Sequence, residues 1–434
     1  MNSIAITVSI FEKFEIRSCV KWILANEFKC LALQFPDNDL SYSADVLSCL
    51  QSELTSNVVE FYIIGDTNNQ CCNDLINVQY CHAEALIHYG HSCLSATLPS
   101  PLPIYYVFYQ QPLDNLTFPH SDKFCLVYYD PCYSEAIDKL RNEQSLERII
   151  YSRIDVLTKE KNDNQFTLYG RSVSSLPHDL DSSLYSIFYI ARDADSMSLT
   201  NFRLYFHTYE FYSYNFHSKQ FDLYPSTSKQ LQKRLYLIEC AKQTSVYGLL
   251  VNSTSLLNQS DTIHRILSYL KQLFHRNDKT YYILLMNTMS ISKMNNFSSI
   301  NCYVLCSSCS ENQWYQQKQF NIPLISVYDL YLAFSSDNSW NNYSLDLEHI
   351  LKHLSTFEED KEEYLSTKTN ELVLKHPNHL VQMSDSNHQP YQRTWWGLEL
   401  TTSKTSVDEN DQKSVAELKH GKSGIAAGYD HELI

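Results

Sequence analysis

The sequence predicts an α/β protein built from three similar βα units and followed by a mostly irregular C-terminal extension. Short apolar runs of strand length alternate with stretches of helical periodicity as far as about residue 335, and this alternation is typical of parallel sheets flanked by helices. With 434 residues, the chain is also longer than one hydrophobic core usually supports. We therefore expect several domains.

The first unit, residues 1–118, opens with the apolar run Cys30–Phe35, which Pro36 and Asp37 end. Apolar residues then recur at helical spacing as far as Leu54, which predicts a strand, a turn and a helix. Further strands are expected at 58–64, 85–89 and 104–108, with a helical stretch at 74–84.

The second unit, residues 119–226, begins with a strand at Phe124–Tyr129 that Asp130 and Pro131 stop. It continues through the apolar segments 149–151, 187–191 and 202–206. Its middle, residues 155–185, is polar, and we expect a loop there.

The third unit, residues 227–335, starts with a helix at 228–242 and a strand at 246–251, and a long helix with one apolar face follows. Strands at 281–286, 302–305 and 324–326 complete it. Residues 336–434 are expected to be the irregular extension, in which one island, residues 391–400, carries the adjacent Trp395 and Trp396. Adjacent tryptophans need a surface to bury against, so the island should dock on the body or on a partner.

Composition excludes several classes of protein. The formal net charge of -15, without a run of Lys or Arg, argues against a nucleic-acid partner. The N-terminus has no signal-peptide pattern and no apolar run reaches the length of a membrane span, so we expect a soluble cytoplasmic protein without a membrane partner. In a reducing compartment the 13 cysteines would stay free, bind metal or do redox work. The eight glycines form neither a dinucleotide fingerprint nor a Walker loop.

Cysteines follow three of the predicted strands. Cys71 and Cys72 come after the strand at 58–64, Cys93 after the strand at 85–89, and Cys309 after the strand at 302–305. Ligands of α/β sheets gather at the carboxyl ends of the strands. Thiolates brought together from these loops would make a metal site, and an iron–sulfur cluster is the site we expect.

The adjacent Cys71 and Cys72 leave two interpretations open. Successive side chains of an extended segment point in opposite directions, so one thiol should face the site and the other the core. Free cysteines are also common as small buried hydrophobes, and for this segment alone both interpretations have equal weight.

The two other cysteine sites have their own context. Before Cys93, Gly90 would allow a sharp turn, and of His88 and His91 we expect one to be a core histidine and the other a hydrogen-bond donor behind the ligands. Cys306 and Cys309 form a lone CxxC pair, which would suit half of a zinc knuckle or a redox pair but is a weak signal without a second pair. Dispersed single ligands are therefore the better interpretation.

Several motifs occur in a fixed order along the chain and identify a resemblance. They are Leu33-Gln34-Phe35-Pro36-Asp37, Gly65-Asp66-Thr67, Cys71-Cys72, His88-Tyr89-Gly90-His91-Ser92-Cys93-Leu94, Pro103-Ile104-Tyr105-Tyr106-Val107-Phe108, Lys293-Met294-Asn295-Asn296-Phe297, Cys309-Ser310-Glu311-Asn312 and Trp396-Gly397-Leu398-Glu399. Together they resemble the family of diphthamide-biosynthesis proteins one and two, and its second-member group more closely. The resemblance covers most of residues 25–335 and islands of the tail.

The resemblance implies three similar Rossmann-like α/β domains around a central 4Fe–4S cluster. It also implies the first step of diphthamide synthesis, in which a 3-amino-3-carboxypropyl group moves from S-adenosylmethionine to a histidine of translation elongation factor 2. In the eukaryotic heterodimer to which the chain is similar, the first subunit does the chemistry, and the cluster of the second helps to keep it reduced with electrons from a small donor protein.

By resemblance, Cys72, Cys93 and Cys309 match the cluster ligands, and Cys71 is the alternative to Cys72. First-subunit members carry a ligand cysteine early in the second domain, where neither Cys125 nor Cys132 has a matching context here. The chain also departs from the family at Asn69-Gln70, Asn252-Ser253-Thr254 and Asn287-Thr288-Met289, where glycines are usual.

Two alternative functions stay open at this stage. The chain could be a self-sufficient homodimeric transferase that does the radical chemistry itself. It could also be a cluster-free scaffold that binds its partner through the island at Trp395 and Trp396.

Overall fold

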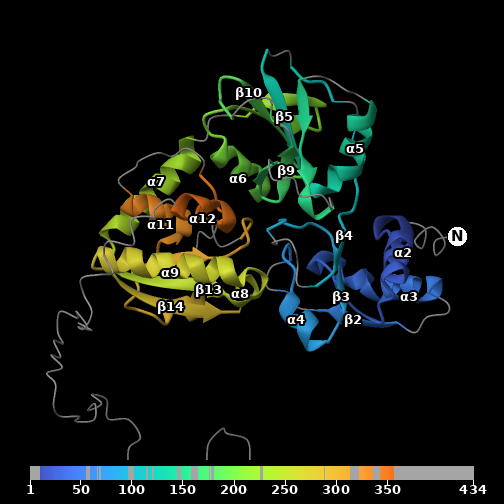
Figure 1. Ribbon diagram of the computed structural model, residues 1–434, viewed down its shortest axis with the longest axis horizontal. Coiled ribbons are helices and arrows are strands. Elements are labelled where there is room, and N and C mark those ends of the chain that lie inside the picture. The colour runs from blue at the N-terminus through green and yellow to red at the C-terminus, as the bar shows by residue number, and fades with distance from the viewer. Residues whose placement is uncertain are drawn as a thin grey trace, which may run out of the picture. The chain divides into compact units, whose positions relative to one another are not determined.

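The fold is described from a computed structural model of the chain (Figure 1). The structure describes residues 10–54, 59–65, 67, 70–95, 102–113, 116–119, 122–143, 148–157, 165–174, 176, 180–224, 228–287, 289–312, 322–335 and 343–355. These residues all belong to one compact unit, residues 1–365. The predicted docking island at 391–400 lies outside the described residues.

The first sheet is parallel and has the strand order β2-β1-β3-β4. Its strands are β1 (Cys30–Gln34), β2 (Glu60–Ile64), β3 (Ala85–Tyr89) and β4 (Ile104–Val107). The accompanying helices are α2 (Ile16–Asn26), the 3-10 helix η1 (Asp37–Tyr42), α3 (Ser43–Glu53) and α4 (Leu75–Tyr80). All of β3 and nearly all of β1 is buried, as expected for central strands of a parallel sheet covered on both faces.

The second sheet has the order β12-β11-β10-β5-β6 and is parallel except for the hairpin of β11 and β12. Its strands are β5 (Phe124–Tyr129), β6 (Ile149–Tyr151), β10 (Tyr185–Ile190), β11 (Glu210–Asn215) and β12 (Gln220–Leu223). The helices of this part are η2 (Pro131–Tyr133), α5 (Ser134–Glu143), η3 (Asp155–Leu157) and α6 (Met197–Tyr205).

One expectation for the second unit is wrong. Part of the predicted loop at 155–185 forms an antiparallel sheet of β7 (Arg153–Ile154), β9 (Arg171–Ser174) and β8 (Gln165–Leu168). The apolar segment 202–206 forms the last turn of α6 and its C-cap, Phe206. Because α6 is buried almost all round, its sequence lacks the amphipathic period that marks a surface helix.

The third sheet is parallel, with the order β14-β13-β15-β16. Its strands are β13 (Val246–Asn252), β14 (Thr280–Met286), β15 (Cys302–Cys306) and β16 (Leu324–Ser326). Its helices are α7 (Ser228–Gln243), α8 (Ser253–Asn258), α9 (Ser260–Arg276), α10 (Ile291–Asn295), α11 (Val327–Phe334) and α12 (Leu347–Ser355). The long α9 buries Ile263, Ile266, Leu270 and Phe274 on one face, which is the predicted amphipathic pattern.

The first part of the expected extension belongs to this core. Tyr343 and Leu345 are buried, and α12 packs against α9. Leu347, Ile350 and Leu351 of α12 recur at helical spacing and are buried, so the sequence did carry the pattern of this helix, and the extension begins later than expected.

The three parallel sheets share one strand order, and the α/β class with parallel sheets is confirmed. In each sheet the chain passes from the first strand to a neighbour on one side and then returns to the other side of the first strand. The point of return lies between β1 and β3, between β5 and β10, and between β13 and β15. The division into three domains with boundaries near 118 and 226 remains a prediction.

Within the part of the chain that the structure describes, no helix is both long and apolar enough to cross a membrane.

Candidate metal centre

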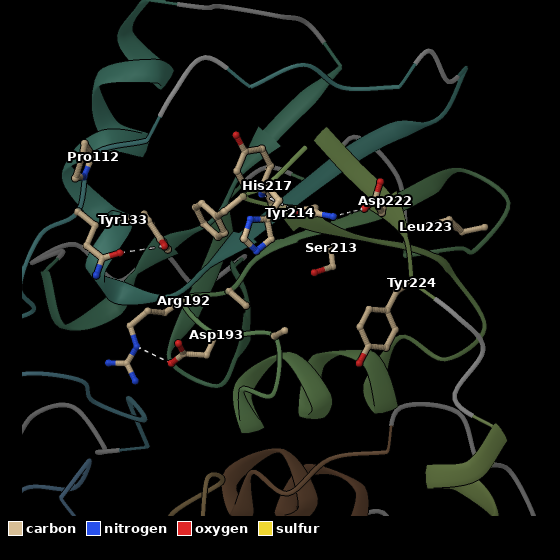
Figure 2. Close-up of a pocket in the computed structure, with 15 residues that line it drawn as sticks. Pro112, Tyr133, Arg192, Asp193, Ser213, Tyr214, His217, Asp222, Leu223 and Tyr224 are labelled. Atoms are coloured by element: carbon tan, nitrogen blue, oxygen red, sulfur yellow. Dashed lines mark hydrogen bonds and ion pairs between the residues drawn. The ribbon is translucent and has the colours of Figure 1, made fainter. Parts of the chain in front are cut away.

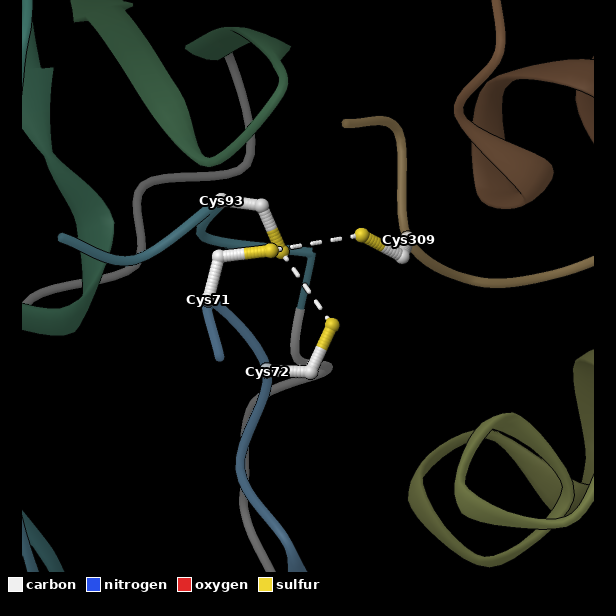
Figure 3. A group of neighbouring side chains, drawn as sticks. All are labelled: Cys71, Cys72, Cys93 and Cys309. Atoms are coloured by element: carbon white, nitrogen blue, oxygen red, sulfur yellow. Dashed lines mark hydrogen bonds between the residues drawn. The ribbon is translucent and has the colours of Figure 1, made fainter. Parts of the chain in front are cut away.

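Four cysteines from two different sheets meet at one point (Figure 3). Cys71 and Cys72 follow β2 and Cys93 follows β3, so three thiols come from the carboxyl end of the first sheet. Cys309 follows β15 of the third sheet. The structure thus brings together all three sites that the sequence singled out, at the strand ends where α/β sheets collect ligands.

The four Sγ atoms all lie within 4.8 Å of one another. The closest pairs are Cys71 with Cys309, at 3.5 Å between Sγ atoms, and Cys72 with Cys93, at 3.6 Å. Cys72, Cys93 and Cys309 are buried, and Cys71 is half-buried. Four thiols this close together can bind a metal ion through sulfur ligands alone.

Both members of the Cys71-Cys72 pair belong to this group, contrary to the expectation that one faces the core. The expectation assumed an extended segment, but residues 70–72 form a turn. A turn removes the strict alternation of side chains that an extended strand imposes.

The thiols perturb one another electrostatically. The pKa of Cys93 lies well below its ordinary value, because Cys309 and the two other thiols donate hydrogen bonds to it. The pKa of Cys71, Cys72 and Cys309 is raised well above the ordinary value within the same buried network. The lowered pKa of Cys93 favours its thiolate, which is the form of cysteine that binds metal.

A backbone hydrogen bond and the side chain of Gln34 position the two cysteine loops of the first sheet. Cys93 N donates to Cys71 O at 3.1 Å. The buried Gln34, at the end of β1, donates from Nε2 to Cys72 O at 2.7 Å and accepts from Asp74 N at 3.0 Å. The turn before Cys93 needs Gly90, whose φ is +91° and where a Cβ would lie 3.0 Å from the ring of Pro36.

The loop of Cys309 is tied to the loop of Cys93 by side chains. Nε2 of His91 lies 2.7 Å from Oε2 of Glu311, and both side chains are largely buried. Gln259 Nε2 donates to Ser95 O at 2.6 Å, and Ser310 N donates to Ser95 Oγ at 3.2 Å. These bonds fix the relative position of thiols that come from different sheets.

The donor set fits two kinds of metal group. Sulfur donors alone suit zinc or an iron–sulfur cluster. Zinc–thiolate bonds of about 2.3 Å place tetrahedral sulfurs about 3.8 Å apart, close to the 3.5 and 3.6 Å found here. A four-iron cluster is larger and requires the thiols to separate, and a small cavity lined by Asn73, Ser92, Ser95, Asn258 and Ser308 adjoins them.

Comparison with known proteins decides the family. The model of a family described as "Putative diphthamide synthesis protein" matches residues 35–344, which is more than half of the chain. The chain belongs to this family. A relative from Schizosaccharomyces pombe named 2-(3-amino-3-carboxypropyl)histidine synthase subunit 2 is 28% identical, over 98% of this chain and 84% of its own. A relative of the same name from Danio rerio is 28% identical, over 95% of this chain and 90% of its own.

A solved structure supports the fold of this diphthamide-synthesis family member. Dph2 from Pyrococcus horikoshii, crystallised with a 4Fe–4S cluster, superposes with a TM-score of 0.57. The match covers 77% of this chain and 94% of that protein, at 14% sequence identity.

The other candidate residues of this family member have different positions. His88 is fully buried, and its Nε2 lies 3.2 Å from His91 O. Its Nδ1 has no hydrogen-bond partner among the described residues, and burial lowers its pKa to about 4. Cys306 lies inside β15, outside the thiol group, and burial raises its pKa to about 12. Among the described residues, Cys125 of β5 and Cys132 of η2 do not join the group either.

Sequence reasoning did not assign roles to Gln34, Ser95, Gln259 and Glu311, which position the loops. Gln34 and Glu311 stand inside motifs that carry the family resemblance, and that was their only signal. Their partners lie up to 220 residues away in the sequence, and local sequence patterns do not predict contacts at such a separation.

Proposed function

We propose that the chain is the iron–sulfur subunit of a heterodimeric complex that catalyses the first step of diphthamide synthesis. In this step a 3-amino-3-carboxypropyl group passes from S-adenosylmethionine to a histidine of translation elongation factor 2. The observation that carries the proposal is the group of four thiols in a chain of the diphthamide synthesis family. The relatives are named as subunit 2 of a histidine synthase, which supports a place in such a complex.

Cys72, Cys93 and Cys309 are the proposed ligands of a 4Fe–4S cluster, with Cys71 as the alternative to Cys72. Bound there, the cluster supplies one-electron reduction and oxidation. The protein buries the sulfurs, and the pair of His91 and Glu311 holds the two ligand loops at a fixed separation.

The proposed role of this subunit is to relay electrons. A small electron-donor protein of the cytoplasm would reduce it, and it would in turn keep the homologous first subunit reduced. Two observations favour a relay over the catalytic role. Asn252 and Asn287 stand where the family usually has glycines that allow close approach to a cofactor, and the described part of the second sheet contributes no thiol to the group.

An exposed apolar edge favours a partner subunit. Strand β14 is an edge strand of the third sheet, and Tyr282, Ile283 and Leu285 are exposed on it. A free edge that carries large apolar side chains invites association with another chain. Coverage by the first subunit would remove this surface from water.

The test is a reconstitution with labelled S-adenosylmethionine and elongation factor. We expect label on the elongation factor only when this chain and the first subunit are combined under reducing, anaerobic conditions. Label transfer by this chain alone would show the homodimeric transferase instead. A second variant complex would contain the Cys72→Ala/Cys93→Ala chain, shown by analysis to be free of iron. If that complex transferred label at the full rate with the physiological donor, this chain would be a scaffold.

A further inference from the structure

The return points of the three parallel sheets are used differently. Cys93 follows β3 and Cys309 follows β15, so the return points of the first and third sheets each supply a thiol to the metal centre. The corresponding point of the second sheet lies between the carboxyl ends of β5 and β10. A pocket of about 770 Å³ begins there and extends past the end of β10 to the β11–β12 hairpin (Figure 2). Open α/β sheets bind ligands at this topological position.

Residues from three strand ends line the pocket. Tyr133 follows β5, Arg192 and Asp193 follow β10, and the hairpin of β11 and β12 forms a further wall. The volume lies in the range of ligand pockets, about 300–1,000 Å³. The metal centre does not include these residues, and neither the thiol group nor the proposed electron relay assigns them a role.

The charged side chains that line the pocket determine whether it favours a cationic or an anionic ligand. Arg192 Nε donates to Asp193 Oδ2 at 2.9 Å, so these two charges offset each other, as Figure 2 shows. Among the described residues that line the pocket, Asp222 is then the one further charge when histidine is counted as neutral. Asn215 Nδ2 donates to Asp222 Oδ2 at 2.8 Å, which orients the carboxylate without neutralising it. The pocket therefore disfavours phosphate and carboxylate ligands and favours a cation.

Aromatic rings line the same pocket and add to this preference. Tyr133 and Phe216 stack with ring centroids 5.7 Å apart, and Tyr214 packs edge-on against Phe216 at 4.9 Å. Phe216 remains 42% exposed and Leu223 63% exposed at the rim. An aromatic face attracts Lys and Arg side chains, and the exposed apolar rim suits the residues on either side of such a side chain.

We propose that this pocket binds a Lys or Arg side chain presented by a protein partner. The volume is larger than one side chain needs, so it accommodates neighbouring residues of the bound segment as well. The net charge of -15 on the chain attracts a basic segment from a distance. The site is independent of the metal centre, and binding to it requires neither iron nor catalysis.

The experiment is an NMR titration of the full-length chain with a blocked pentapeptide that has Arg at its centre and Ala on both sides. The matched probe carries citrulline, which keeps the shape of Arg without its charge. We expect saturable binding of the Arg peptide at millimolar concentration and at least about fivefold weaker binding of the citrulline peptide. Asp222→Asn should weaken binding of the Arg peptide to a similar extent, and Phe216→Ala should weaken it too.

The control is Glu239→Gln, which removes one negative charge from an exposed residue of α7, outside the pocket. Equal weakening by Asp222→Asn and Glu239→Gln would mean that only overall charge matters and would overturn the proposal. Absence of saturable binding, equal binding of both peptides, or preferential binding of adenosine monophosphate would overturn it as well. Asp222→Asn keeps the shape of an exposed side chain, and thermal melting of each variant checks that the fold is intact.

Discussion

Replacement of Glu311 by alanine should make the metal centre lose iron faster. The carboxylate of Glu311 joins the Cys309 loop to His91 in the Cys93 loop through a 2.7 Å contact. Hydrogen bonds to charged groups contribute about 1.5–3 kcal/mol to stability. Since the two side chains are 25% and 10% exposed, we take the lower end, which corresponds to about a tenfold increase in local opening of the two loops.

The assay loads the anaerobic protein with iron and sulfide and follows iron transfer to a chelator. Glu311→Ala should release iron about tenfold faster than the wild type, and Glu311→Gln, which keeps a hydrogen-bond acceptor, should fall between them. Glu239→Ala, which loses only a surface bond to Lys242, should not change the rate. If Glu311→Ala released iron at the wild-type rate and kept the wild-type melting temperature, the role of the His91–Glu311 pair would be refuted.

Three further predictions concern the relay, the second sheet and the N-terminal helix. A complex assembled with the Cys72→Ala/Cys93→Ala chain should turn over slowly with a physiological donor but retain much activity with excess dithionite. Loss of activity under both reductants, with the partner's cluster intact, would mean that the roles of the two subunits are reversed. Asp130→Ala leaves the buried guanidinium of Arg171 without its carboxylate and should lower the free energy of unfolding by about 3–5 kcal/mol; an unchanged urea midpoint would contradict this. Burial, followed by a nearby carboxylate, raises the pKa of Glu15 from 4.5 to about 7, so the wild type loses stability as the pH rises from 4.5 through 7. Glu15→Gln should therefore be the more stable protein by about 1 kcal/mol at about pH 8, with no gain near about pH 4, as measured by thermal melting at both pH values.

The sequence predicted the parallel strands well because they are short, apolar and ended by clear turn residues. Runs such as Cys30–Gln34 and Thr280–Met286 are strands in the structure close to their expected bounds. The antiparallel strands Gln165–Leu168 and Arg171–Ser174 were missed because each has only four residues and lies within a mostly polar stretch. Such short strands depend on pairing with a neighbouring strand, and the local sequence pattern does not predict that pairing.

The candidate site could be predicted as far as topology determines it. The carboxyl ends of parallel strands are predictable from the order of the elements, and the cysteines at Cys72, Cys93 and Cys309 do meet. The inclusion of Cys71 depends on a local turn, and the pairing of His91 with Glu311 depends on the packing of two sheets. Neither follows from the spacing of residues in the chain.

Metal and sulfide analysis of anaerobically purified protein tests the central claim most directly. The account predicts a brown protein that contains iron and acid-labile sulfide in equal amounts, about four of each per chain, with little zinc. Cys72→Ala, Cys93→Ala and Cys309→Ala should each deplete iron, and Cys49→Ala, outside the group, should not. A colourless protein with one zinc ion per chain, or full iron content in Cys309→Ala, would contradict the account.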